Sequence, residues 1–74
     1  MKMSIKEQLI HDINTMDIDN IYIFCRWFSV YYKVNFEDVM TLLRDLQKEG
    51  EVEEHIIDRC IKEQDDFKSM FRGY

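Results

Sequence analysis

The stretch IYIFCRWFSVYYKV, residues 21–34, is the most apolar part of the chain and limits what the chain can fold into. A membrane span needs about 20 apolar residues, and a charge at its centre costs about 2.5–3.5 kcal/mol. This stretch is shorter and carries Arg26 near its middle. A half-buried strand would alternate apolar and polar residues, which the stretch does not do. The sequence therefore favours a helix and gives no membrane span.

Polar and amphipathic side chains recur along this region at helical spacing. The intervals between them are three, four, three and four residues, which places them on one stripe of a helix: Asp19, Tyr22, Arg26, Ser29 and Lys33. We expect this stripe to face water and the rest of the helix, over 18–34, to be apolar. Asp17 or Asp19 is the expected N-cap. Three short neighbouring helices can hardly cover so apolar a helix, so we expect part of its surface to contact another protein.

Caps and apolar periodicity predict helices on both sides of this central one. Ser4 and Glu7 form a capping box for a helix over 4–16. Asn35 caps a helix over 36–49 that ends before a glycine.

The last helix is expected over 52–72. It is either unbroken or interrupted at 63–66, where no apolar residue occurs for more than a turn. The fold class we expect is all-α, a small bundle of about four helices around the central helix 18–34. With 74 residues, the chain is expected to form a single helical domain over 1–74.

Composition narrows the class of protein. The net charge is −5, and residues 35–74 carry eleven acids against six bases, which makes nucleic acid an unfavourable partner. Two cysteines and a first segment without a continuous apolar run indicate free thiols and a cytoplasmic location. The absence of Ala and Pro beside many Ile, Lys, Asp and Asn is typical of an AT-rich genome, such as that of a low-GC bacterium or its phage.

No motif for catalysis or for a cofactor occurs in the chain. The possible nucleophiles, bases and metal ligands are Cys25, Cys60, His11 and His55, and none shows the spacing of a zinc site. Two glycines cannot build the usual phosphate-binding loop. We therefore expect neither an enzyme nor a metal or cofactor site.

Two segments are candidate partner surfaces. The first is an acidic run, which is either a solvated helix start or a surface for a basic partner: Glu49, Glu51, Glu53, Glu54 and Asp58. The second is a set of apolar anchors, Trp27 on the central helix and Phe67, Met70 and Phe71 at the spacing of a helix laid in a groove. The competing interpretation is that these last three pack on the protein's own core.

The function we expect is that of a small acidic, non-enzymatic regulator or inhibitor that binds a protein. By analogy, it is phage or mobile-element encoded and acts on a host nucleic-acid-handling protein, in an anti-restriction or anti-CRISPR role. A homodimer is a further expectation, since a second copy would also cover apolar surface.

The alternative is a DNA-binding regulator. The segment NFEDVMTLLRDLQKEGEV resembles the recognition helix and glycine turn of winged-helix and helix-turn-helix proteins, and Arg44 and Lys48 would contact DNA. That helix would lead with Glu37 and Asp38, where phosphate contacts are expected.

Overall fold

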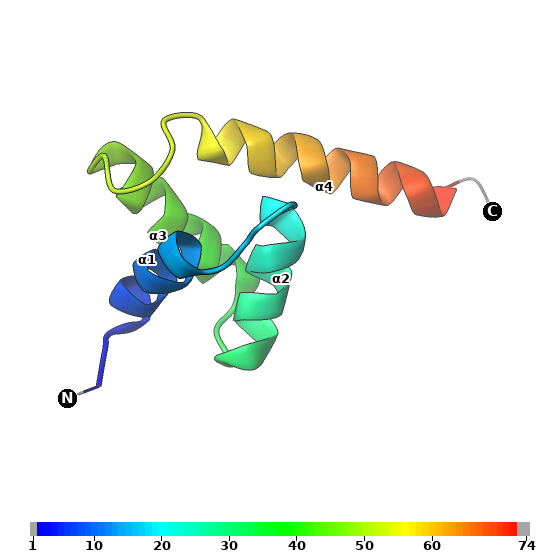
Figure 1. The fold of residues 1–74 in the computed structure, drawn as a ribbon. Coiled ribbons are helices and arrows are strands. Elements are labelled where there is room, and N and C mark those ends of the chain that lie inside the picture. Colours follow the sequence, from blue (N-terminus) through cyan, green and yellow to red (C-terminus); the bar gives the residue numbers. More distant parts are fainter. Residues whose placement is uncertain (1, 73–74) are drawn as a thin grey trace.

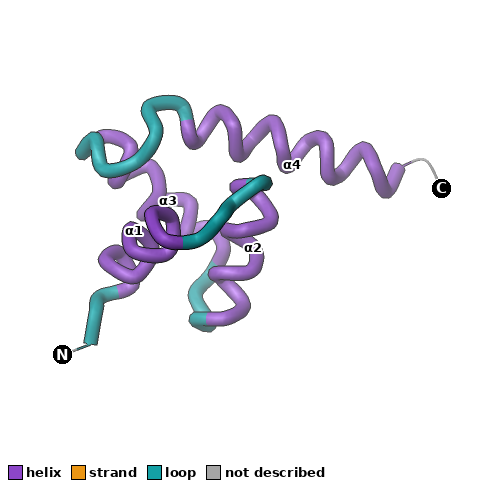
Figure 2. Tube along the Cα trace, viewed as in Figure 1, coloured by secondary structure: helices purple, strands orange, loops and turns teal. Residues whose placement is uncertain are grey.

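Four helices make up most of residues 2–72, the part of the chain that the computed structural model describes. In chain order they are α1 (Ile5–Thr15), α2 (Ile21–Tyr31), α3 (Phe36–Lys48) and α4 (Ile56–Arg72). Loops and turns connect them, and these residues contain no strand (Figure 2). The expected all-α fold class is confirmed.

The core lies where α2, α3 and α4 meet, and α1 packs on α3. It is formed by side chains from all four helices: Leu9, Ile21, Tyr22, Phe24, Cys25, Phe28, Val39, Leu43, Leu46, Ile56, Ile57 and Cys60. The first half of α4 crosses one end of α2, and its second half extends beyond the other helices (Figure 1). The molecule is therefore elongated, with extents of 47 × 26 × 22 Å.

The predicted caps of α1 and α3 are present. The Ser4 hydroxyl accepts a hydrogen bond from the Glu7 N–H at 3.1 Å, and the Glu7 carboxylate accepts one from the Ser4 N–H at 3.2 Å. The Asn35 side chain accepts a hydrogen bond from the N–H of Glu37 at 2.9 Å. These short-range signals fix where both helices begin.

Two helices end in the same kind of turn, built on different residues. After α3, Gly50 takes a φ of 74°, and the Glu51 N–H bonds to the Leu46 carbonyl at 3.0 Å. After α2, Lys33 takes a φ of 55°, and the Val34 N–H bonds to the Ser29 carbonyl at 2.9 Å. Both arrangements are Schellman motifs, which need a left-handed residue just after the helix. Lysine pays a steric cost there that glycine does not.

Helix α2 begins at Ile21, three residues later than the expected 18, and neither Asp17 nor Asp19 is its N-cap. Asn20 accepts a hydrogen bond from the N–H of Ile23 at 2.9 Å. Glu63 of α4 accepts one from the N–H of Ile21 at 2.8 Å. Contact with a distant helix therefore helps to set this boundary.

Helix α4 begins at Ile56, four residues later than the expected 52. Gln47 of α3 accepts a hydrogen bond from the N–H of Ile57 at 3.0 Å, and this contact helps to hold the start of the helix there. It then continues unbroken through 63–66, as one of the two interpretations of the sequence expected.

The expectation that Tyr22 faces water is wrong, because Tyr22 is only 5% exposed. Its ring packs edge-on against Phe36, with centroids 5.7 Å apart, and lies tilted against Phe67, with centroids 5.4 Å apart. Arg26 is exposed, with its guanidinium 5.8 Å from the Phe36 ring centroid. Asp19 and Lys33 of the expected stripe are also exposed and Ser29 is half-buried. Packing between rings of α3 and α4 therefore removes Tyr22 alone from the solvent side of α2.

Candidate functional site

The solvent side of α2 is largely apolar. Four exposed apolar side chains form what we call the outer face of α2: Ile23, Trp27, Val30 and Tyr31. They are 50%, 38%, 76% and 64% exposed, respectively. Trp27 and Tyr31 stack with centroids 5.0 Å apart and an interplanar angle of 27°. The stacked pair forms a contiguous exposed apolar surface, and such surfaces mark interaction sites in proteins that are otherwise polar outside.

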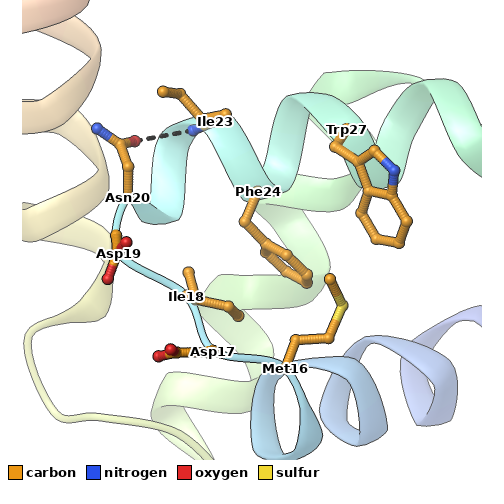
Figure 3. A pocket seen from close by; sticks show the side chains of 8 residues that line it. All are labelled: Met16, Asp17, Ile18, Asp19, Asn20, Ile23, Phe24 and Trp27. Atoms are coloured by element: carbon orange, nitrogen blue, oxygen red, sulfur yellow. Dashed lines mark hydrogen bonds between the residues drawn. The ribbon is translucent and has the colours of Figure 1, made fainter.

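An open hollow of about 420 Å³ lies where this face meets the link between α1 and α2. Its lining consists of Met16, Asp17, Ile18, Asp19, Asn20, Ile23, Phe24 and Trp27. Figure 3 shows the side chains of Met16, Ile18, Phe24 and Trp27 converging, while Ile23 lies apart from them. Phe24 belongs to the core, so the hollow has a fixed floor, whereas Met16 and Trp27 are 43% and 38% exposed.

The edge of the hollow is acidic. The carboxylates of Asp17 and Asp19 lie along the link, outside the group of apolar side chains (Figure 3). One cation contacts the link, since Arg59 donates a hydrogen bond to the backbone carbonyl of Asp19 at 3.1 Å. Arg59 also lies 3.4 Å from Glu53 and 3.6 Å from Glu63. Two carboxylates therefore already face this guanidinium, and in the described part of the chain neither Asp17 nor Asp19 has an ion-pair partner.

Three apolar residues near the end of α4 differ in burial: one packs on the core and two are exposed to solvent. Phe67 is half-buried against Tyr22 and lies 4.9 Å, centroid to centroid, from Phe71. Met70 and Phe71 are 71% and 61% exposed. The structure thus packs the first of the three predicted anchors on the core and leaves the other two on the overhanging end.

The acidic run lies mostly in the loop before α4, not on a helix start. Glu49 caps the end of α3 and pairs with Lys6, an interaction that raises the pKa of Lys6 through its hydrogen bond to Glu49. Glu53 lies near Arg59, and Asp58 lies 3.8 Å from the His55 ring. Glu51 and Glu54 are exposed, and no ion pair is recorded for either within residues 2–72. The run is therefore partly neutralised by its own neighbours.

Arg44 and Lys48, the candidate DNA contacts, are exposed on the solvent side of α3. The same helix also exposes Glu37, Asp38 and Asp45. Acids thus outnumber bases on this surface, which is unfavourable for contact with phosphates.

The two thiols are buried at the contact between α2 and α4. The Cys60 Sγ lies 3.7 Å from the Met40 sulfur. Its hydrogen bonding to Cys25, together with burial, raises the pKa of the Cys25 thiol, so Cys25 stays protonated at neutral pH. His11 and His55 are both exposed, on α1 and in the loop before α4. Residues 2–72 contain no group of three or more His, Cys, Asp or Glu placed to hold a metal ion.

Sequence reasoning missed Asp12, a charged side chain that is only 6% exposed. Gln8 donates a hydrogen bond to one of its carboxylate oxygens at 2.9 Å, and the Tyr32 hydroxyl donates to the other at 3.1 Å. Partial burial and the bond to Asp12 raise the pKa of Tyr32. The available signal was that Asp12 lies three residues after Leu9, on the apolar side of α1.

Comparison with known proteins adds no family to this description. No family model, no curated protein and no solved structure matches the chain. Of the helices in the described residues, none has both the length and the apolar character needed to cross a bilayer.

Proposed function

We propose that this protein is a small, non-enzymatic regulator that acts by binding another protein and inhibiting it. The observation that carries the proposal is the outer face of α2, where four large apolar side chains are more than a third exposed. Trp27 lies within it, next to a hollow, and tryptophan is among the residues that most often dominate binding energy at interfaces.

The net charge of −5 supports a basic partner. Glu51 and Glu54 add exposed negative charge on the loop before α4. By analogy, a protein that handles nucleic acid is the class of target we propose, since such proteins expose basic grooves that an acidic inhibitor can occupy. A phage or mobile-element origin and a cytoplasmic location belong to the same proposal, which the AT-rich composition supports.

The test is capture of a partner from lysate of a low-GC bacterium on the immobilised full chain, with Trp27→Ala as the matched variant. We expect a basic protein to be retained with near-micromolar affinity by the original chain and much less by the variant. Ile61→Ala is the control, because Ile61 is an apolar side chain of α4 that is 44% exposed and belongs neither to the outer face of α2 nor to the hollow lining. Retention of no protein at this affinity counts heavily against a regulator, and equal retention by Trp27→Ala moves the binding site away from α2.

Two further measurements separate the alternatives. Sedimentation at several concentrations tests a homodimer, which would also cover the outer face of α2. DNA binding that weakens steeply with salt and is lost in an Arg44→Ala, Lys48→Ala double variant would favour the DNA-binding regulator instead.

A further inference from the structure

We infer that the hollow beside Trp27 accepts an apolar side chain from a partner segment that carries Lys or Arg next to that side chain. The inference rests on the proposed function and names the chemistry of the partner at this one site. Three properties of the hollow lead to it: its apolar floor, its acidic edge and the absence of free polar groups directed inwards.

The floor and walls favour an apolar side chain. Phe24 is 5% exposed and fixed by the core, and Met16 and Trp27 flank it (Figure 3). Methionine is flexible enough to adjust to different apolar shapes. Tryptophan offers a large flat surface at a small cost in conformational freedom, because its side chain has only two rotatable bonds.

The edge favours a positive charge beside that side chain. Asp17 and Asp19 are exposed, and no Lys or Arg in residues 2–72 forms an ion pair with either. Their carboxylates lie outside the apolar group (Figure 3), so a base would remain partly in water while its apolar neighbour enters the hollow. Such edge charges guide association and select partners of the opposite sign.

The same features disfavour two other occupants. In a two-fold symmetric dimer, a second copy would bring the like charges of its own Asp17 and Asp19 to this edge, in a chain that already carries a net charge of −5. A small polar ligand would need convergent donors and acceptors to orient it. The one side-chain amide in the lining belongs to Asn20, whose oxygen already accepts a hydrogen bond from the N–H of Ile23 and whose nitrogen points away from the apolar group (Figure 3).

The test is selection of binders from a random peptide display library on the full chain, followed by titration of the enriched peptides. Trp27 is the only tryptophan in the sequence, so its fluorescence reports contact with the hollow. The titrations are repeated by calorimetry on three variants: Asp17→Asn with Asp19→Asn, Trp27→Ala, and Ile61→Ala on the exposed side of α4 as the control. Circular dichroism verifies that each variant is folded.

We expect enriched peptides to share an apolar residue with Lys or Arg beside it and to shift the Trp27 emission. Affinity should fall about tenfold or more in Trp27→Ala and about threefold or more in the double Asn variant, with little change in Ile61→Ala. Added salt should weaken binding to the original chain more than to the double Asn variant.

The inference is overturned if no peptide is enriched or if the enriched peptides lack Lys and Arg. It is also overturned if Trp27→Ala and the double Asn variant bind the peptides as tightly as the original chain does. An emission shift that depends on protein concentration alone would also overturn it, because a second copy would then fill the hollow. Each of these results leaves the proposed regulator intact, since the lysate capture measures partner binding at any surface.

Discussion

The two sides of α2 are made of similar residues and lie in opposite surroundings. The inner side, with Phe24, Cys25 and Phe28, is at most 5% exposed, while Val30 and Tyr31 on the outer face are 76% and 64% exposed. Helices α3 and α4 cover one side only. In a chain of 74 residues, the number of neighbouring helices decides which apolar side chains are buried, and apolar character alone does not.

The largest difference in stability is expected between side-chain truncations on the inner side and on the outer face of α2. Phe28→Ala should lower the free energy of unfolding by about 3–5 kcal/mol, because Phe28 is fully buried and its loss leaves a cavity. Val30→Ala, two residues away on the outer face, should change it by less than about 0.5 kcal/mol. Urea unfolding measures both, and similar losses at the two positions would contradict the assignment of inner and outer sides.

The inner side also carries a thiol that should make stability fall at alkaline pH. In the unfolded chain, Cys25 loses its proton near the ordinary pKa of 9.0, whereas in the folded chain its raised pKa keeps the proton bound. The folded state therefore holds more protons above this pH, and stability should decrease by up to about 1.4 kcal/mol per pH unit. Urea unfolding from pH 7 to 10.5 measures the decline, which should be shallower in a Cys25→Ala, Cys60→Ala double variant, because burial raises the pKa of Cys60 once its hydrogen bond to Cys25 is lost.

The start of the inner side depends on a side chain from α4. Glu63→Ala removes the acceptor for the N–H of Ile21 and should cost about 1 kcal/mol, typical for loss of a helix cap. Asp66→Ala is the matched control, since Asp66 is exposed on the same helix and no side-chain hydrogen bond is recorded for it within residues 2–72. If the thermal melts of the two variants coincide, Glu63 does not stabilise the start of α2.

Substitutions in the turn after α2 and in the turn after α3 should change the stability of the protein in opposite directions. Lys33→Gly relieves a left-handed backbone at a non-glycine residue and should stabilise the protein by somewhat less than about 1 kcal/mol. Gly50→Ala introduces that strain, although the space around Gly50 is open, and should destabilise by about the same amount. Melting temperatures test the pair, and changes of the same sign would contradict the shared turn geometry.

Local signals in the sequence were enough for the fold class and for the ends of α1 and α3. Ser4 with Glu7, Asn35 and Gly50 all act within a few residues, so their roles could be predicted without knowing the packing. The boundaries of α2 and α4 could not, because Glu63 and Gln47 reach them from other helices. Asp17, Asp19 and Asn20 are all good N-caps, and nothing local selects among them.

The candidate site was only partly predictable for the same reason. Trp27 could be named from the apolar excess of its helix. The hollow could not, because it is formed where Met16 and Ile18 of the link meet α2. Nor could the burial of Tyr22, which depends on rings from α3 and α4 approaching it. Side chains that contact distant segments carry no local signal of that contact.

The second half of α4 extends beyond the other helices, so the two halves of this continuous helix differ in how firmly their hydrogen bonds are held. Ile56, Ile57 and Cys60 anchor its first turns in the core, whereas beyond Phe67 the described side chains are exposed. A helical turn without tertiary contacts is held by its backbone hydrogen bonds alone, which are marginal in water. Amide protons of the last turn should therefore exchange with solvent far faster than those near Cys60, and this end of α4 can fray while the core remains closed.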